Sequence, residues 1–202
     1  MKKILPIFII TFVVVLIGAA GFNMIRDREA AKEPFGDPFN LVTMDGQPFT
    51  ENDLHATPAV IFFGFTHCPD VCPTTLYELD GWLNQLGPDA ENIKAYFVSV
   101  DPERDTQEIM KTYVGNVSKR IIGITGTPEN IAAMVKSYHV YAKKVPTDDG
   151  DYTMDHTASV FMLDKVGFFR GTIAYQENSD TALQKLKNLA KGRADASVQK
   201  PQ

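Results

Sequence analysis

The order of apolar and polar positions along the chain predicts strands that alternate with helices. Residues 58–65, PAVIFFGF, form a continuous apolar run of strand length. Because this run does not alternate with polar residues, it is predicted to be a central strand buried on both faces. Residues 74–86 instead carry leucines three and four residues apart, the spacing of a helix that buries one face, and Pro73 suits the first helical position.

The remaining elements follow from the same patterns. Two short apolar runs around Asp45–Gly46 predict a tight hairpin over residues 39–49, and residues 157–164 and 167–175 predict a second hairpin. The other predicted elements are strands at 93–100, 121–125 and 140–145, and helices at 106–114, 128–138 and 178–192. Strands that alternate with helices, followed by a terminal hairpin and helix, indicate an α/β sandwich with a mixed central sheet.

The N-terminal residues are predicted to anchor the chain in a membrane. Residues 4–22 contain no charge and, as one transmembrane helix, would span about 28 Å, close to the hydrocarbon thickness of a bilayer. Lys2 and Lys3 precede this segment, so the positive-inside rule puts the N-terminus in the cytoplasm and the rest of the chain outside. This topology is that of a single-pass protein of a bacterial inner membrane. A signal peptide cleaved near Gly18–Ala20 is the alternative and leads to the same compartment.

The predicted organisation is an anchor over residues 1–25, a polar linker over 26–37, one domain over 38–192 and a disordered tail over 193–202. The formal charge of the chain is −5, and its only charged residues before Arg26 are two lysines, so the remainder carries −7. This acidic balance argues against nucleic acid as a partner.

Both cysteines of the chain lie in one short segment, THCPDVCPTT. Cys68 is predicted just beyond the central strand and Cys72 just before the following helix, at the edge where α/β sheets bind their ligands. The N-terminus of a helix favours a thiolate, so we expect a lowered pKa for Cys72 at least. Pro69 and Pro73 are expected to hold both cysteines in a loop, where the two sulfurs can converge.

Two thiolates make an incomplete site for a soft metal ion, which needs at least one further donor. The candidate imidazoles are His55, His67, His139 and His156. His55 is expected in a polar loop, and His67 is expected to point away from the neighbouring Cys68. His139 is expected to pack at the end of a helix. His156 precedes an apolar strand in a loop that can fold over the cysteines, although spacing alone cannot show that it does.

Three stretches resemble the signature blocks of the Sco/SenC family, thioredoxin-like copper proteins needed to build the copper A centre of cytochrome c oxidase. These stretches are FFGFTHCPDVCPTTL, VSVDPERDT and MDHTASVFMLD, and they occur in the family's order. The resemblance extends from about Pro38 to the final helix and includes the N-terminal anchor. It implies a thioredoxin-like fold and copper ligands at Cys68, Cys72 and His156. Gln107 departs from the family's pattern, which has proline there, and this concerns the start of a helix and not the ligands.

The chemistry of these donors agrees with the resemblance. Two thiolates and one imidazole suit Cu(I) in a trigonal site, with Cu(II) as a second oxidation state, whereas zinc would need a fourth ligand or a water. Asp155 is a candidate for that ligand or for a partner that orients the His156 ring. Asp101 is a candidate for a supporting role near the metal, and the alternative is a strand-end or helix-capping carboxylate beside Arg104. Met154 is expected to pack at the rim of the core.

The resemblance implies a membrane-anchored copper metallochaperone. It would receive one copper ion from another donor protein and pass it by thiolate exchange to the copper A subunit of cytochrome c oxidase. Because no bond of a substrate is broken in this transfer, the protein is expected not to be an enzyme. The alternative is an extracytoplasmic thiol-disulfide oxidoreductase that acts on the cysteines of an oxidase subunit, with a thiol reductant as partner. Two cysteines four residues apart, such as Cys68 and Cys72, can fall within the Cα separation that a reversible disulfide tolerates. A peroxidase is disfavoured, because Phe65 stands where peroxiredoxins carry threonine.

Overall fold

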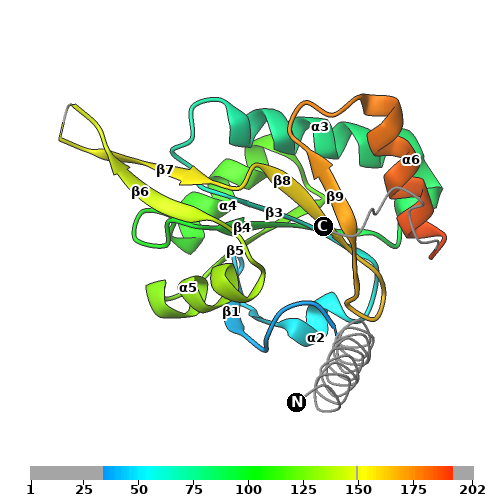
Figure 1. Cartoon of the computed structure of the whole chain (residues 1–202), viewed down its shortest axis with the longest axis horizontal. Helices are drawn as coiled ribbons and strands as arrows, with labels where there is room; N and C mark the ends of the chain where they lie inside the picture. Colours follow the sequence, from blue (N-terminus) through cyan, green and yellow to red (C-terminus); the bar gives the residue numbers. More distant parts are fainter. Residues whose placement is uncertain (1–33, 149, 193–202) are drawn as a thin grey trace, which may run out of the picture. The chain divides into compact units, whose positions relative to one another are not determined.

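The computed structural model describes residues 34–148 and 150–192. Within them, seven strands form one sheet in the order β2-β1-β5-β4-β3-β8-β9, and β6 and β7 form a separate two-stranded sheet (Figure 1). The strands are β1 (Asn40–Thr43), β2 (Pro48–Thr50), β3 (Ala59–Gly64), β4 (Lys94–Ser99), β5 (Ile121–Thr125), β6 (Ala142–Pro146), β7 (Tyr152–His156), β8 (Ser159–Leu163) and β9 (Phe169–Ala174). The helices are α2 (Glu51–Leu54), α3 (Val71–Leu86), the 3₁₀ helix η1 (Gly87–Ala90), α4 (Gln107–Val117), α5 (Pro128–Ser137) and α6 (Ser179–Ala190).

The large sheet is mixed, as the sequence predicted. β3 runs parallel to β4 and β4 runs parallel to β5, whereas the other strand pairs of this sheet are antiparallel. α3 and α6 lie on one face of the sheet and α5 lies on the other (Figure 1). Every residue of β3 is buried, because strands flank it on both sides and helices cover both faces. The prediction of a doubly buried central strand is therefore confirmed.

The first turn of α3 differs from the prediction. The helix begins at Val71, two residues before Pro73, and therefore includes Cys72. The expectation that both cysteines lie in a loop is wrong for Cys72. The first N–H groups of a helix have no acceptor within the helix, so proline is tolerated in the first turn and does not mark its first residue. Cys68 lies in the loop after β3, as expected.

The segment that leads to β8 is a strand and not the predicted loop. β7 ends at His156 and pairs antiparallel with β6, with Ala142 opposite His156. Most of β6 is exposed to solvent. The two strands therefore depend on pairing with each other more than on burial, and for this reason the hydrophobic pattern does not reveal β7.

The N-terminal boundary of the domain lies earlier than predicted. The backbone N–H of Phe35 donates to the Gly167 carbonyl at 2.8 Å, and the Phe35 ring packs against Phe169 and Tyr138 with centroid separations of 5.0 and 5.2 Å. Phe35 thus belongs to the packed domain rather than to the linker. The predicted membrane segment, the start of the linker and the predicted tail lie outside the described residues. Among the helices of residues 34–148 and 150–192, none is both long enough and apolar enough to cross a bilayer.

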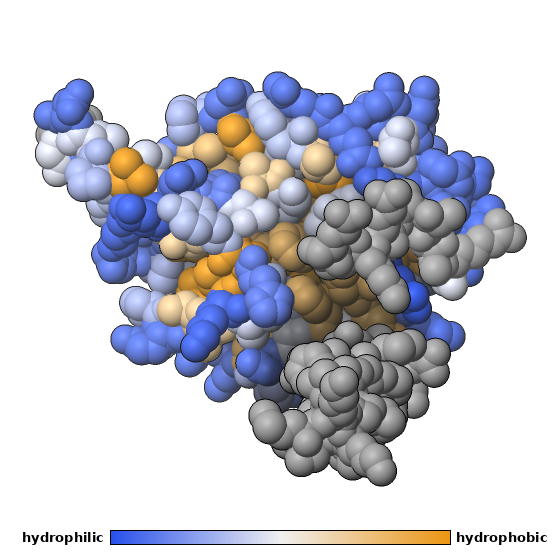
Figure 2. Space-filling view, viewed as in Figure 1, coloured by the Kyte–Doolittle hydropathy of each residue, from blue (hydrophilic) through white to orange (hydrophobic). Residues whose placement is uncertain are grey.

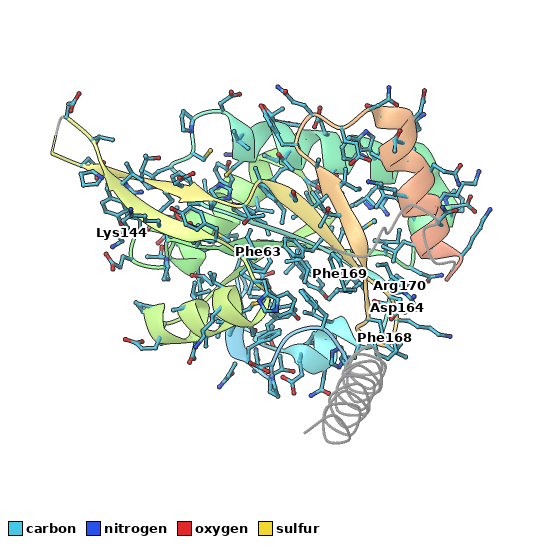
Figure 3. The ribbon with its side chains drawn as sticks, in the orientation of Figure 1. Phe63, Lys144, Asp164, Phe168, Phe169 and Arg170 are labelled. Atoms are coloured by element: carbon cyan, nitrogen blue, oxygen red, sulfur yellow. The ribbon has the colours of Figure 1, made fainter. Side chains whose placement is uncertain are left out.

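The predicted C-terminal hairpin is confirmed, and a carboxylate closes its turn. Asp164 accepts hydrogen bonds from the backbone N–H groups of Val166 and Phe168, both at 3.0 Å. Its other oxygen pairs with the Arg170 guanidinium, which reaches back from β9 (Figure 3). This turn holds β9 against β8, and β8 in turn lies beside β3.

Replacing glycine by alanine is expected to have opposite effects on stability at two positions. A Cβ atom on Gly64 in β3 would lie 2.6 Å from Phe97 Cε2 and 2.8 Å from Cys72 Sγ, whereas one on Gly81 in α3 would meet no atom within 4 Å. We expect Gly64→Ala to lower the free energy of unfolding by about 1–3 kcal/mol through overpacking. We expect Gly81→Ala to raise it by about 0.5–1 kcal/mol, because alanine favours the helix. Chemical denaturation measures both, and a Gly64→Ala variant as stable as the parent would contradict this packing.

Candidate metal centre

Antiparallel pairing brings two distant segments of the chain together. β8 runs antiparallel to β3, with Val160 opposite Phe62, so the start of β8 lies beside the end of β3. Cys68 follows the end of β3, and His156 precedes the start of β8. The fold therefore closes the separation of 84 residues between Cys72 and His156 that spacing alone left open.

The structure brings the three predicted ligands into one cluster. The donor atoms of Cys68, Cys72 and His156 all lie within 4.8 Å of one another. Cys72 Sγ is 3.5 Å from His156 Nε2, and the backbone N–H of Cys72 donates to Cys68 Sγ at 3.4 Å. Neither cysteine forms a disulfide. No other group of three histidine, cysteine or acidic side chains within the described part of the chain comes as close together.

The imidazole of His156 presents Nε2 to the sulfurs. Its Nδ1 lies 3.1 Å from the carbonyl oxygen of Thr157. A carbonyl oxygen only accepts hydrogen bonds, so in a neutral ring that donates from Nδ1 to this carbonyl the lone pair lies on Nε2, the nitrogen that faces the sulfurs. The ring also packs edge-on against Phe62 and Phe65, with centroid separations of 6.0 and 5.8 Å. These contacts orient the ring with Nε2 toward the sulfurs.

The two sulfurs occupy different environments. Cys72 is fully buried at 0% exposure, whereas Cys68 is half-buried. The Cys72 sulfur lies where a side chain on Gly64 would otherwise be, since an added Cβ would approach it to 2.8 Å. Gly64 is a site residue that we did not identify from the sequence. The available signal was a glycine inside an apolar strand, which often marks the close approach of another group.

The thiolate of the pair is Cys68. A hydrogen bond from the Cys72 side chain lowers the pKa of Cys68 from 9.0 to about 4, against opposing burial and with a smaller contribution from His156. The same interaction and burial raise the pKa of Cys72. The expectation of a lowered pKa for Cys72 is therefore wrong. The N-terminus of α3 acts on the other sulfur, because the first-turn N–H of Cys72 points at Cys68.

Asp101 lies at the end of β4 and supports the strand that carries His156. Its buried carboxylate pairs with Arg104 and accepts a hydrogen bond from Tyr152 Oη at 2.8 Å. The Arg104 guanidinium lies 3.7 Å from the centroid of the Tyr152 ring, and its Nη1 donates to the Tyr152 carbonyl at 2.9 Å. The predicted neighbour Arg104 is confirmed. Asp101 is outside the donor cluster, and its side chain contacts Tyr152 at the start of β7 instead.

The structure does not bring Asp155 to the cluster. Asp155 is exposed and lies opposite Lys143 in the β6–β7 pair. Since successive residues of a strand face opposite sides, its side chain points away from that of His156. The partner of the His156 ring is the Thr157 carbonyl instead. Met154 is buried, with 9% of its surface exposed, as expected for packing at the rim.

A second buried carboxylate, Asp105, holds the cysteine loop, and we did not identify it from the sequence. It accepts hydrogen bonds from Thr66 Oγ1 and Ser99 Oγ, both at 2.6 Å, and from the Thr66 N–H at 3.2 Å. Burial raises the pKa of Asp105, while these hydrogen bonds oppose the rise. Asp105 lies in the VSVDPERDT stretch, so that motif was the available signal. It ties Thr66, two residues before Cys68, to the end of β4.

The other histidines lie elsewhere. His67 is exposed, with Nδ1 3.1 Å from Thr66 Oγ1. His139 follows the end of α5 and is exposed, although its ring lies 6.1 Å from the Phe35 ring between centroids. The half-buried His55 lies against Gly167. None of the three joins the donor cluster.

Comparison with known proteins identifies relatives across most of the chain. The sequence model of the SCO1/SenC family matches residues 27–191. "Protein SCO2, mitochondrial" of Saccharomyces cerevisiae is 36% identical over 165 residues, which cover 80% of this chain and 54% of that protein. The chain spans about half the length of the curated relatives it matches.

Solved structures match the domain over nearly their whole length. Bradyrhizobium japonicum ScoI, solved with copper bound, is 46% identical and superposes with a TM-score of 0.71 over 77% of this chain and 99% of its own. Yeast Sco1, also solved with copper bound, is 32% identical, with a TM-score of 0.73 over 83% of this chain and 96% of its own. The thioredoxin-like fold with a mixed central sheet is thereby confirmed. From the family match across residues 27–191 and these relatives, the chain belongs to the SCO1/SenC family.

Proposed function

We propose that this protein is a copper metallochaperone that binds one copper ion through Cys68, Cys72 and His156. The observation that carries this proposal is the convergence of the two sulfurs and one imidazole within 4.8 Å. The related ScoI and Sco1 structures that contain copper support it. The ion is cargo, so it is taken up and released without a chemical change in a substrate.

The donor set favours copper over zinc. Structural zinc sites are nearly always four-coordinate, and catalytic zinc sites keep a water as the fourth ligand. The described part of the chain offers three donors in this cluster, and Asp155, the fourth ligand that the sequence suggested, is exposed and does not join them. Two thiolates and one neutral imidazole are soft donors that suit three-coordinate Cu(I).

The unequal environments of the two sulfurs suggest an order of uptake. Cys68 is already a thiolate and is the more exposed, so it meets the ion first. His156 Nε2 then supplies its lone pair, and Cys72 releases its thiol proton as it binds the ion. Release runs in reverse, because a thiolate of the acceptor can displace the accessible Cys68 before the buried Cys72. The acceptor in this proposal is the copper A subunit of cytochrome c oxidase, and a separate protein supplies the copper.

We also propose that the domain is held at a membrane and faces outward from the cytoplasm. The uncharged stretch at residues 4–22 and the two lysines before it support this topology. An anchored chaperone is confined to the bilayer that contains its acceptor, which raises its effective concentration at the acceptor.

A thiol-disulfide oxidoreductase is the second candidate, and the state of Cys68 favours it. A half-buried thiolate beside a second free thiol is the arrangement of a reversible redox pair. Oxidation of both cysteines would use the same electron pairs that bind copper. One molecule therefore cannot hold copper and a disulfide at the same time, and the role of His156 separates the two candidate functions.

Removal of the His156 imidazole should abolish high-affinity copper binding. In His156→Ala only the two sulfurs remain, and we expect the Cu(I) affinity of the reduced protein to fall by at least about 100-fold, since loss of even an indirect ligand contact costs 10–100-fold. Competition with a chromophoric Cu(I) chelator under anaerobic conditions measures the affinity.

His67→Ala is the matched control, because His67 adjoins Cys68 but lies outside the cluster. We expect parental affinity in this variant. If His156→Ala keeps the parental copper affinity while both variants still oxidise reversibly at the cysteine pair, the redox function replaces the chaperone function.

The reduced, metal-free protein should react with iodoacetamide at Cys68 in mildly acidic solution. Because the pKa of Cys68 lies below its ordinary value, its thiolate persists as the pH falls and is lost only near pH 4. The rate of alkylation should therefore be nearly constant between about pH 6 and pH 8, where an ordinary thiol slows about tenfold per pH unit. Peptide mass spectrometry identifies the modified cysteine.

Two variants at Cys72 test the cause of this reactivity. Cys72→Ala removes the hydrogen bond to Cys68 and should move the loss of reactivity to higher pH, whereas Cys72→Ser retains a donor and should resemble the parent more closely. A rate in the parent that rises tenfold per pH unit over the same range would contradict the assignment of Cys68 as the thiolate.

A further inference from the structure

Both halves of the donor cluster are attached to the same short segment of the chain. Thr66, near Cys68, donates through Oγ1 to Asp105, and Ser99 Oγ donates to the other oxygen of Asp105, both at 2.6 Å. The N–H of Asp101 donates to Ser99 Oγ at 3.0 Å. The cysteine loop is thereby joined by hydrogen bonds to residues 99–105, the segment that leaves β4.

The strand that carries His156 is attached to the same segment from the other side. Tyr152 is the first residue of β7, four residues before His156, and its Oη donates to Asp101 Oδ1 at 2.8 Å. Arg104 binds both of these residues, because it pairs with Asp101 and donates to the Tyr152 carbonyl at 2.9 Å. Residues 99–105 form a frame, defined by Ser99, Asp101, Arg104 and Asp105, that connects the cysteine loop with β7.

The β6–β7 hairpin has few other attachments. It belongs to no larger sheet, and four of the five residues of β6 are exposed. The hairpin projects from the domain, and its outer part is largely hydrophilic (Figure 2). Lys144, which lies on β6 (Figure 3), pairs with Glu103 at 2.6 Å. Both side chains are about half exposed, so this ion pair adds little stability. Met154 is the buried apolar contact of β7.

The contact between Tyr152 and Asp101 differs from these in burial. The Asp101 side chain is 0% exposed, so its carboxylate depends on the hydrogen bonds that Arg104 and Tyr152 donate. A hydrogen bond to a buried charge is stronger and more strictly oriented than one at the surface. The direction of β7 at Tyr152 is therefore constrained, and a strand transmits that constraint along its length to His156.

We propose that Tyr152, held by the frame through Asp101, is a positioning residue that keeps the His156 imidazole facing the cysteines before a metal ion arrives. Its effect on copper rests on the proposed function, whereas its effect on the metal-free protein does not. A preordered imidazole binds without first being immobilised, and it retains the ion longer once bound.

The test compares the full chain with its Tyr152→Phe variant, both purified in detergent. This substitution removes only the hydroxyl and keeps the ring beneath Arg104. We expect the ring ¹⁵N NMR signals of His156 in the metal-free variant to leave the single Nδ1-protonated pattern and broaden. We also expect Cu(I) to be released at least about tenfold faster, the lower limit for loss of a partner that orients a ligand.

Tyr141→Phe is the matched control, since Tyr141 precedes the same hairpin and is 52% exposed. It should behave like the parent in both measurements. Thermal unfolding of each variant shows whether the domain is folded. Should Tyr152→Phe fail to fold, Arg104→Lys removes the contacts to the Tyr152 ring and carbonyl and is expected to mobilise His156 in the same way.

The outcomes separate this inference from the proposed function. If the parent does not bind Cu(I) but Tyr152→Phe still mobilises the His156 ring, the positioning role stands and the chaperone function fails. If the His156 signals and the Cu(I) release rate are unchanged in folded Tyr152→Phe and Arg104→Lys, the inference is overturned.

Discussion

The structure around the site depends on the need to satisfy two carboxylates buried at the end of β4. Asp101 and Asp105 are exposed by only 1% and 0%. A buried carboxylate is costly unless hydrogen bonds or a cation compensate for the lost water. The partners come from Thr66 in the cysteine loop and from Tyr152 on β7, so satisfying these charges also fixes the two segments that carry the candidate ligands.

The two cysteines differ in burial and therefore in protonation and accessibility. Cys72 sits in the first turn of α3 against the space left by Gly64, where its thiol is protected and acts as a hydrogen-bond donor. Cys68 receives that hydrogen bond and is the accessible thiolate. A protein that only stored a metal would gain from burying every ligand. A set of three donor groups in which one sulfur is accessible instead suits an ion that enters and leaves the site.

The sequence predicted elements such as β3 and α3, because the spacing of their apolar residues indicates which faces are buried. It also placed both cysteines at the correct edge of the sheet. The sequence-based predictions failed for features that do not depend on the spacing of apolar residues. β7 has no apolar pattern because pairing with β6 holds it, and the start of α3 is hidden because proline is permitted anywhere in the first turn. The assignment of the thiolate also failed, because that depends first on the hydrogen bond that the buried Cys72 side chain donates to Cys68, which is a tertiary contact.

By itself the sequence determined the α/β order of elements, the two neighbouring thiols and, through resemblance, the choice of His156. It could not determine that the imidazole meets the sulfurs, because 84 residues separate Cys72 from His156 and local spacing carries no information about such a distance. Only the tertiary structure decided this. The antiparallel pairing of β8 with β3 brings the cysteine loop and the segment that carries His156 together, and the hydrogen bonds of residues 99–105 hold them there.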